Sequence, residues 1–377
     1  MSLLPTPTAL LGAVGDDAHI DDQLYLRARL VDLCFNRAFD SDAAGVWHAP
    51  GPLLILGGRA QGPSLSLATH WRAMVAARPR EDRTVHIHLL GSGDETAVLG
   101  LDDPAADGEA PAEAVALATI VRTLARRGHP VGGVDLLRAT DVPTGVGLGI
   151  DAAVRAATAR AVCGLAGARS GSVELVAALD EACGDDADHQ VCLTAPEGYA
   201  ALARPGPSGS GVTPQRPPPC VRFDPAQHGF RLMLVTLRVA PGTPPPTAWE
   251  ASDAEDAIAA EGFRLLTAGG GHPGAGTLPA QLGALLDRSH AATSAQREPA
   301  ATDRVVDAAR EAGALGARAL SPRAVLAAVR TPDLATVRSA VLAACAGAAE
   351  TSLGARFLTT AGLAGAGQGA GSIDGLP

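Results

Sequence analysis

The sequence predicts an α+β fold, because segments with helical spacing of apolar residues and segments with strand-like alternation are mixed along the whole chain. Of its 377 residues 47% are hydrophobic, which is enough for the core of one large domain or two ordinary ones. Only 3% are aromatic, so the core must consist mainly of Ala, Val and Leu. No internal repeat indicates a repeat architecture.

The first half of the chain is expected to mix helices with strands. At residues 20–39, apolar residues recur every three or four positions after early acidic residues, which predicts a helix. Alternation at Thr84–Leu90 predicts a strand with His86 and His88 together on a solvated face. Two such histidines are a weak metal-binding signal without a third ligand. Further strands are expected at Leu53–Leu56, Trp71–Ala77 and Val134–Ala139, and helices at Pro111–Arg127 and Val173–Ala182.

The second half is expected to begin near a stretch rich in Pro, Gly and Ser at residues 204–219. This stretch predicts a boundary between two domains, residues 1–205 and 206–377. The Gly/Ala-rich tail from Ala361 is expected to be loose. The expected strands are Phe230–Val239 and Ala324–Val329, and the expected helices are Trp249–Ala260, Pro279–Arg288, Ala301–Gly313 and Asp333–Ala349.

Charge and composition exclude several classes of function. The net charge is −10 without any basic block, so nucleic acid and anionic membranes are not expected as partners. No apolar run is long enough to span a bilayer and the first residues lack a positive signal region, so a cytoplasmic location is expected. All 30 basic residues are arginine, which excludes a Schiff-base lysine. The six scattered cysteines form no CxxC motif, and nothing in the sequence indicates an oligomeric state.

The most informative stretch is Asp141–Cys163, a glycine-rich loop that runs into an alanine-rich helix. Glycines let a backbone approach phosphate closely, and the unpaired N–H groups of a first helical turn attract anions. This stretch is therefore a candidate nucleotide phosphate loop. Its candidate contact residues are Pro143, Gly145, Gly147, Leu148, Gly149 and Asp151.

Seven stretches in the same order resemble motifs of galactokinases, in the GHMP kinase superfamily. They cover nearly the whole chain: Ala49–Gly51, residues 78–85, Asp141–Val154, Asp188–Gln190, Phe223–Val239, Gly283–Ser294 and Val305–Arg318. The resemblance implies a two-lobe GHMP kinase fold, with a ribosomal-protein-S5-like N-terminal lobe and a ferredoxin-like C-terminal lobe. It also implies ATP and Mg²⁺ as cofactors, if the chain is active, and a sugar-like small-molecule ligand.

The departures from the family motifs fall on the residues that carry the chemistry. The segment Gly58–Gly62 is a shortened remnant of the sugar-binding loop without its acids, and it leaves Gly58, Arg59 and Gln61 as candidate substrate residues. The other departures are Pro52 for the arginine beside the phosphoryl group, Gly149, Ile150 and Asp151 for three serines, His189 for the catalytic aspartate, Ser252 and Asp253 for paired arginines, and Ala319–Arg323 for the last glycine loop.

Asp151 and the pair Asp188–His189 have more than one reading. Asp151 is expected to cap the helix and repel a bound phosphate, by about 4 kcal/mol at 4 Å; the alternative is that it holds Mg²⁺. Asp188, after a shift by one position, or His189 is a candidate base, and the simpler reading is a polar pair on a surface loop. A metal site formed by Cys183, Asp186, His189 and Cys192 is a third reading, although the spacing fits no zinc pattern.

Three functions follow from this resemblance. The first is a galactokinase-like pseudoenzyme, ancestrally a carbohydrate kinase, that binds a small molecule or a partner with impaired catalysis. The second is an active, divergent ATP-dependent kinase for a sugar or another small hydroxyl compound. The third is a different reaction in the same cleft, such as decarboxylation.

Overall fold

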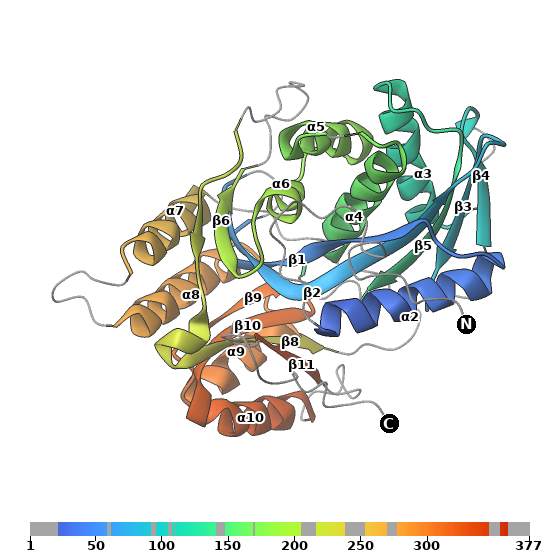
Figure 1. The fold of residues 1–377 in the computed structure, drawn as a ribbon. Helices are drawn as coiled ribbons and strands as arrows, with labels where there is room; N and C mark the ends of the chain where they lie inside the picture. Colours follow the sequence, from blue (N-terminus) through green and yellow to red (C-terminus); the bar gives the residue numbers. More distant parts are fainter. Residues whose placement is uncertain are drawn as a thin grey trace.

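The computed structural model describes residues 22–58, 62–91, 96–104, 108, 110–140, 148–168, 170–204, 216–237, 253–269, 277–346 and 355–360. Within these residues the chain forms two β-sheets with helices packed on both of their faces (Figure 1). The α+β class predicted from the sequence is therefore confirmed. Residues 141–147 of the glycine loop and the tail from Ala361 lie outside the described part.

The first sheet has the strand order β4-β3-β5-β2-β6-β7, and β1 pairs with β2 beside this path. Strand β2 organises it: β1 runs antiparallel along its length, while β5 and β6 pair with its two ends. The expected strands lie within β1, β2, β3 and β5. The bounds are β1 (Gly45–Gly57), β2 (Ser64–Pro79), β3 (Thr84–Leu89), β4 (Thr96–Gly100), β5 (Val134–Thr140), β6 (Tyr199–Ala203) and β7 (Cys220–Arg222).

Strand β1 is much longer than the predicted Leu53–Leu56, because it continues through Pro50, Gly51 and Pro52. The two prolines lack an N–H group, yet β1 tolerates them because, among the described strands, it forms a ladder only with β2. Its register shifts between Pro50 and Pro52, and on its other side Leu53 forms a single isolated bridge. The predicted strand began only after these residues and missed the part of β1 that precedes them. The solvated face predicted for β3 is also wrong in part, because His88 is buried and His86 Nδ1 lies 3.5 Å from Asp135.

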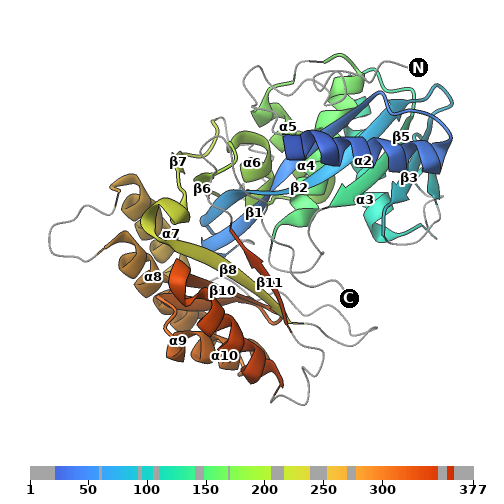
Figure 2. The same cartoon turned by 60° about the horizontal axis from the view of Figure 1, so that its bottom comes forward.

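Helices cover both faces of the first sheet (Figure 2). α2 (Asp22–Phe39) buries Ala28, Val31 and Phe35 against Val46 and Met74 on one face. The other face is covered by α3 (Ala112–Arg126), α4 (Ile150–Leu165), α5 (Ser172–Cys183) and α6 (Ala187–Thr194). The helices predicted at 20–39, Pro111–Arg127 and Val173–Ala182 are confirmed as α2, α3 and α5.

The second sheet has the order β11-β8-β10-β9, with every pair antiparallel. Its strands are β8 (Phe230–Leu237), β9 (Gly316–Ser321), β10 (Ala324–Arg330) and β11 (Ala355–Thr359), and short 3₁₀ turns lie at Pro225–His228 and Thr331–Asp333. Its helices are α7 (Asp253–Thr267), α8 (Leu278–Ser294), α9 (Ala301–Glu311) and α10 (Leu334–Ala346). Helix α7 extends seven residues beyond the predicted end at Ala260, because Leu265 and Leu266 are also buried.

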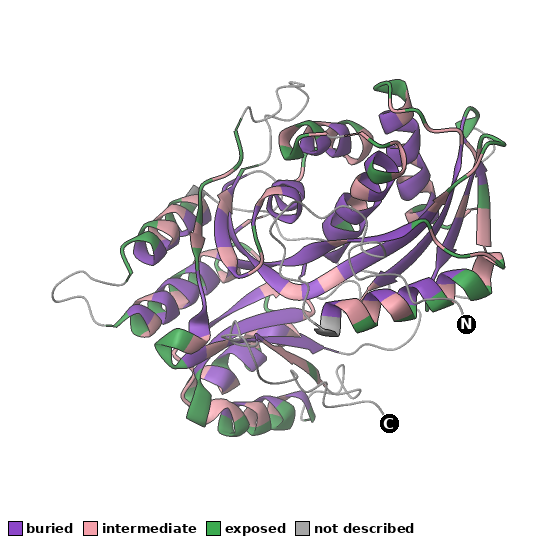
Figure 3. Ribbon diagram, in the orientation of Figure 1, coloured by how far each residue is buried: buried purple, intermediate pink, exposed green. Residues whose placement is uncertain are grey.

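One apolar cluster joins the two sheets. Leu53 and Leu56 of β1 belong to the same buried cluster as Leu232 of β8, Leu326 of β10 and Leu285 of α8. Figure 3 shows buried residues along the strands of both sheets. The domain boundary near residue 205 stays a prediction. Among the described helices, none combines the length and apolar character needed to cross a membrane.

Candidate active site

The start of α4 is fixed to the edge strand β1. Gly149, the residue before the helix, donates its N–H to the Pro52 carbonyl at 3.0 Å, and Leu148 forms an isolated bridge with Leu53. The first helical turn of α4 therefore lies directly beside the middle of β1. The positive end of the helix dipole favours an anion there, although the Ile150 N–H already donates to the Leu148 carbonyl at 2.7 Å.

Asp188 lies against this helix start. A Cβ atom built on Gly149 would overlap Asp188 Oδ2 and lie 2.6 Å from Pro52 Cγ. Gly149 has an ordinary φ of −70°, so glycine is required here for space and not for backbone conformation. The Asp188 side chain is 1% exposed, and its residue sits in the first turn of α6, where Asp186 caps its N–H at 2.9 Å. The structure thus brings Pro52, Gly149 and Asp188 together.

His189 lies in a different environment from its neighbour. Its Nδ1 is 2.9 Å from Asp180 Oδ1 of α5, and its side chain is fully buried. The reading of Asp188 and His189 as a polar pair on a surface loop is therefore wrong, because both are buried within α6. Of the two, only Asp188 lies at the glycine that begins α4.

Asp151 does not cap α4 as expected. The N-cap is Gly149, the helix start has no side-chain capping bond, and Asp151 is exposed at the second helical position. The expectation failed because α4 begins at Ile150, two residues earlier than a cap at Asp151 requires. Within the described residues no three His, Cys, Asp or Glu side chains gather as metal ligands, so the site postulated at Cys183, Asp186, His189 and Cys192 does not form.

The candidate substrate loop is only partly described. Gly58 is half-buried at the end of β1, while Arg59 and Gln61 lie outside the described residues. Gly62 packs closely on α7, where a Cβ atom would overlap the Asp256 carboxylate. Helix α7 therefore contacts the described end of this segment at Gly62.

Two arginines that contact elements of the site, the buried Arg318 and the half-buried Arg160, were missed by the sequence reasoning. Arg318, to which no role was assigned, is 3% exposed; it donates to Glu255 at 2.9 Å and to the Ile55 and Gly57 carbonyls of β1 at 3.3 Å. Arg160 on α4 donates to backbone carbonyls of β1 and α6. The available signal for Arg160 was its position seven residues after the buried Ala153, on the inward stripe of an alanine-rich helix.

Nearby charge and burial disfavour protonation of one histidine of β1. Burial first, and then the positive charges of Arg72 and Arg160, lowers the pKa of His48 to about 3. His48 is thus held neutral in the folded protein over the physiological range.

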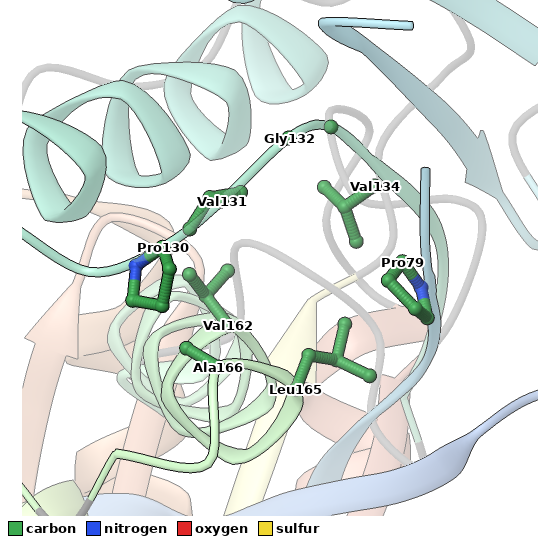
Figure 4. Close-up of a pocket in the computed structure, with 9 residues that line it drawn as sticks. Pro79, Pro130, Val131, Gly132, Val134, Val162, Leu165 and Ala166 are labelled. Atoms are coloured by element: carbon green, nitrogen blue, oxygen red, sulfur yellow. The ribbon is translucent and has the colours of Figure 1, made fainter. Parts of the chain in front are cut away.

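The candidate site is distinct from an apolar hollow shown in Figure 4. The hollow has a volume of about 30 Å³ and is lined by residues such as Pro130, Val134, Val162 and Leu165. It lies at the C-terminal end of α4, some 20 Å along the helix from Gly149 at ~1.5 Å per residue. Its lining offers no charged side chain to a ligand.

Comparisons with solved structures agree on one fold, although no protein-family model matches the chain. The galactokinase of Lactococcus lactis in complex with galactose superposes with a TM-score of 0.66 at 15% identity, covering 88% of this chain and 97% of that one. The mevalonate kinase of Methanococcus jannaschii gives 0.57 at 13% identity, covering 85% and 98%. A putative sugar kinase from Campylobacter jejuni gives 0.54 at 13% identity, covering 78% and 91%. The chain therefore has the α+β fold of the GHMP kinases.

Proposed function

We propose that this chain is a kinase-type enzyme that transfers a phosphoryl group from ATP to a hydroxyl group of a small molecule, with Asp188 as the base. The observation that carries the proposal is the buried Asp188 carboxylate beside Gly149, at the start of α4. The fold supports it, because solved proteins of this fold are named as kinases. This departs from the pseudoenzyme reading, which assumed that His189 had replaced the base.

The residues at the site have chemically separate roles in this proposal. The N–H groups at the start of α4, together with the preceding glycines, bind the phosphates of the nucleotide. Asp188 orients the substrate hydroxyl and accepts its proton, which is the role of a carboxylate base in phosphoryl transfer. The edge strand β1, through the Pro52 carbonyl, holds Gly149 in register with Asp188.

Magnesium fits the residues at this helix start. Mg²⁺ is typically bound through one or two carboxylates together with phosphate oxygens, and Asp151 is an exposed carboxylate on the first turn of α4. Asp151 would hold the ion, while Asp188 keeps its role as the base. When bound, Mg²⁺ would supply neutralisation of phosphate charge.

The substrate is proposed to be a sugar-like molecule, with galactose as the first compound to try. Gly58, Arg59 and Gln61 remain predicted substrate residues next to the end of β1. Arg59 is suited to pair with an anionic group of the substrate, since guanidinium forms two parallel hydrogen bonds with carboxylate or phosphate.

A second candidate, a binder with little or no catalysis, is favoured by the composition of the same helix start. Gly149, Ile150 and Asp151 provide no hydroxyl group, although hydroxyls hold phosphate and Mg²⁺ in many kinases. The proposed enzyme is accordingly expected to be slow. Nucleotide binding without turnover would support this second candidate.

The deciding experiment measures ADP release with Mg·ATP over a panel of sugars and other small hydroxyl compounds. Asp188→Asn should lower kcat by roughly 10²–10⁴ on the best substrate, the usual contribution of a general base. Asp307→Asn, a change at a mostly exposed carboxylate of α9, should leave kcat unchanged. Absence of ADP release from the wild type with every compound, or equal rates for Asp188→Asn and the wild type, would refute the proposal.

A further inference from the structure

Arg160 links three elements that form the candidate active site. It lies on α4, and its Nη1 donates to the His48 carbonyl of β1 at 2.8 Å. Its Nη2 donates to the carbonyls of Cys192 and Leu193, both at 3.2 Å. These two carbonyls belong to the last turn of α6, where backbone oxygens have no partner within the helix.

The guanidinium group thus acts as a C-terminal cap of α6 supplied by another helix. The last carbonyls of a helix carry partial negative charge, so a cation placed there is stabilised. Burial nonetheless lowers the pKa of Arg160, because the guanidinium group is removed from water and these three hydrogen bonds go to neutral carbonyls. The three hydrogen bonds therefore tie the end of α6 to α4 and β1.

The geometry connects this cap to Asp188. Helix α6 spans only Ala187–Thr194, so Asp188 in its first turn and the capped carbonyls in its last turn move together. Helix α4 contacts both ends of α6: Gly149 meets the Asp188 side chain, and Arg160 meets Cys192 and Leu193. Two contacts along one pair of helices fix both the distance and the rotation of α6 relative to α4.

We propose that Arg160 is a positioning residue, which clamps α6 to α4 and β1 and thereby holds the Asp188 carboxylate at the start of α4. The role in catalysis rests on the proposed function, whereas the clamp itself does not. His189, bonded to Asp180 of α5, fixes the same short helix from a third side.

The first test measures the clamp without any activity. Hydrogen–deuterium exchange is followed in the wild type, Arg160→Met and Arg160→Lys. The Met variant removes the charge and all donors, whereas the Lys variant keeps the charge on a single ammonium group and serves if the Met variant does not fold. Amides of α6 should exchange roughly tenfold faster in the variants, as for the loss of a helix cap. Amides of α10 should not change. Arg126→Met, at a 61% exposed arginine paired with Glu181, is the matched control and should leave α6 unchanged.

The second test addresses Asp188 directly. In a crystal structure of Arg160→Lys the Asp188 carboxylate should move away from Gly149 by about 1 Å, a displacement that can cost about a hundredfold in rate. With the substrate found above, kcat should therefore fall about a hundredfold while KM for ATP changes little.

The outcomes separate the two proposals. If the wild type shows no phosphoryl transfer, the proposed function fails. The exchange and structural measurements still show whether Arg160 holds α6 against α4 and β1. The clamp is refuted if α6 exchange and the Asp188 position are the same in wild type and variant. It is also refuted if exchange accelerates equally in α6 and α10, because that pattern indicates general destabilisation.

Discussion

Asp188 and His189 are adjacent in the chain but meet different partners. Neighbouring residues on a helix point about 100° apart, so Asp188 faces Gly149 of α4 while His189 faces Asp180 of α5. The family motif aligned His189 with the base position, but in the folded chain it is Asp188 that lies against Gly149 at the start of α4.

His48 gives a prediction at the same scale. Its pKa is about 3 in the folded protein and near 6.5 when unfolded, so between these values only the unfolded chain takes up a proton. Lowering the pH from 6.5 toward 3 therefore destabilises the fold, by up to about 1.4 kcal/mol per pH unit. The free energy of unfolding is measured with urea for the wild type and His48→Leu at pH 7.5 and 4.5. It should fall less between the two pH values in the variant than in the wild type.

The control for this measurement is His228→Leu, at an exposed histidine beside β8. It should lose as much stability on acidification as the wild type does. Equal losses for His48→Leu and wild type would show that His48 is not the group whose protonation is coupled to unfolding.

At the scale of elements, the site depends on how closely α4, α6 and β1 approach one another. Gly149 and Gly171 both precede helices with negative φ values, −70° and −66°. The two glycines differ in the room around them: a Cβ atom on Gly149 would overlap Asp188 and Pro52, whereas a Cβ atom on Gly171 would have no other atom within 4 Å. This pair separates the loss of a capping glycine from the loss of close packing.

Gly149→Ala should destabilise the protein by about 1–3 kcal/mol, the usual cost of overpacking, and should reduce any kinase activity by displacing Asp188. Gly171→Ala should cost at most about 1 kcal/mol, because alanine is a poorer N-cap residue than glycine but meets no other atoms here. Thermal unfolding in parallel measures both. A loss for Gly149→Ala no larger than that for Gly171→Ala would contradict the close contact.

At the scale of the whole molecule, a buried polar network joins the two sheets. Glu255 Oε1 on α7 accepts hydrogen bonds from Ser289 and Thr293 of α8, both at 3.1 Å, and from Arg318 of β9 at 2.9 Å. Arg318 in turn reaches the backbone of β1 at Ile55. The network lies under the end of β1, so it fixes the second sheet relative to the strand that carries the candidate substrate loop.

Removing one partner of this network should be far more costly than removing both. Glu255→Leu removes the carboxylate that faces the buried Arg318 guanidinium and should cost about 3–5 kcal/mol, while Glu255→Leu combined with Arg318→Met should cost less. Glu261→Leu, which breaks an exposed pair with Arg288, should cost at most about 1 kcal/mol. Chemical denaturation of all four proteins provides the values. A double variant less stable than Glu255→Leu alone would rule out this account.

The sequence by itself determined the α+β class and most of the helices and strands. Helices α2, α3 and α9 could be predicted because their apolar residues repeat with the helical period, and β3 because its residues alternate with the period of a strand. The glycine loop leading into α4 was visible because glycine content and helix periodicity are local properties.

Only the tertiary structure decided which groups meet at the site. Pairing of β1 on one side permits Pro50 and Pro52 within a strand, and the packing of α6 between α4 and α5 selects Asp188 over His189. The roles of Arg160 and Arg318 are contacts between residues far apart in the chain. Such contacts depend on the relative rotation of packed elements, which local periodicity does not specify.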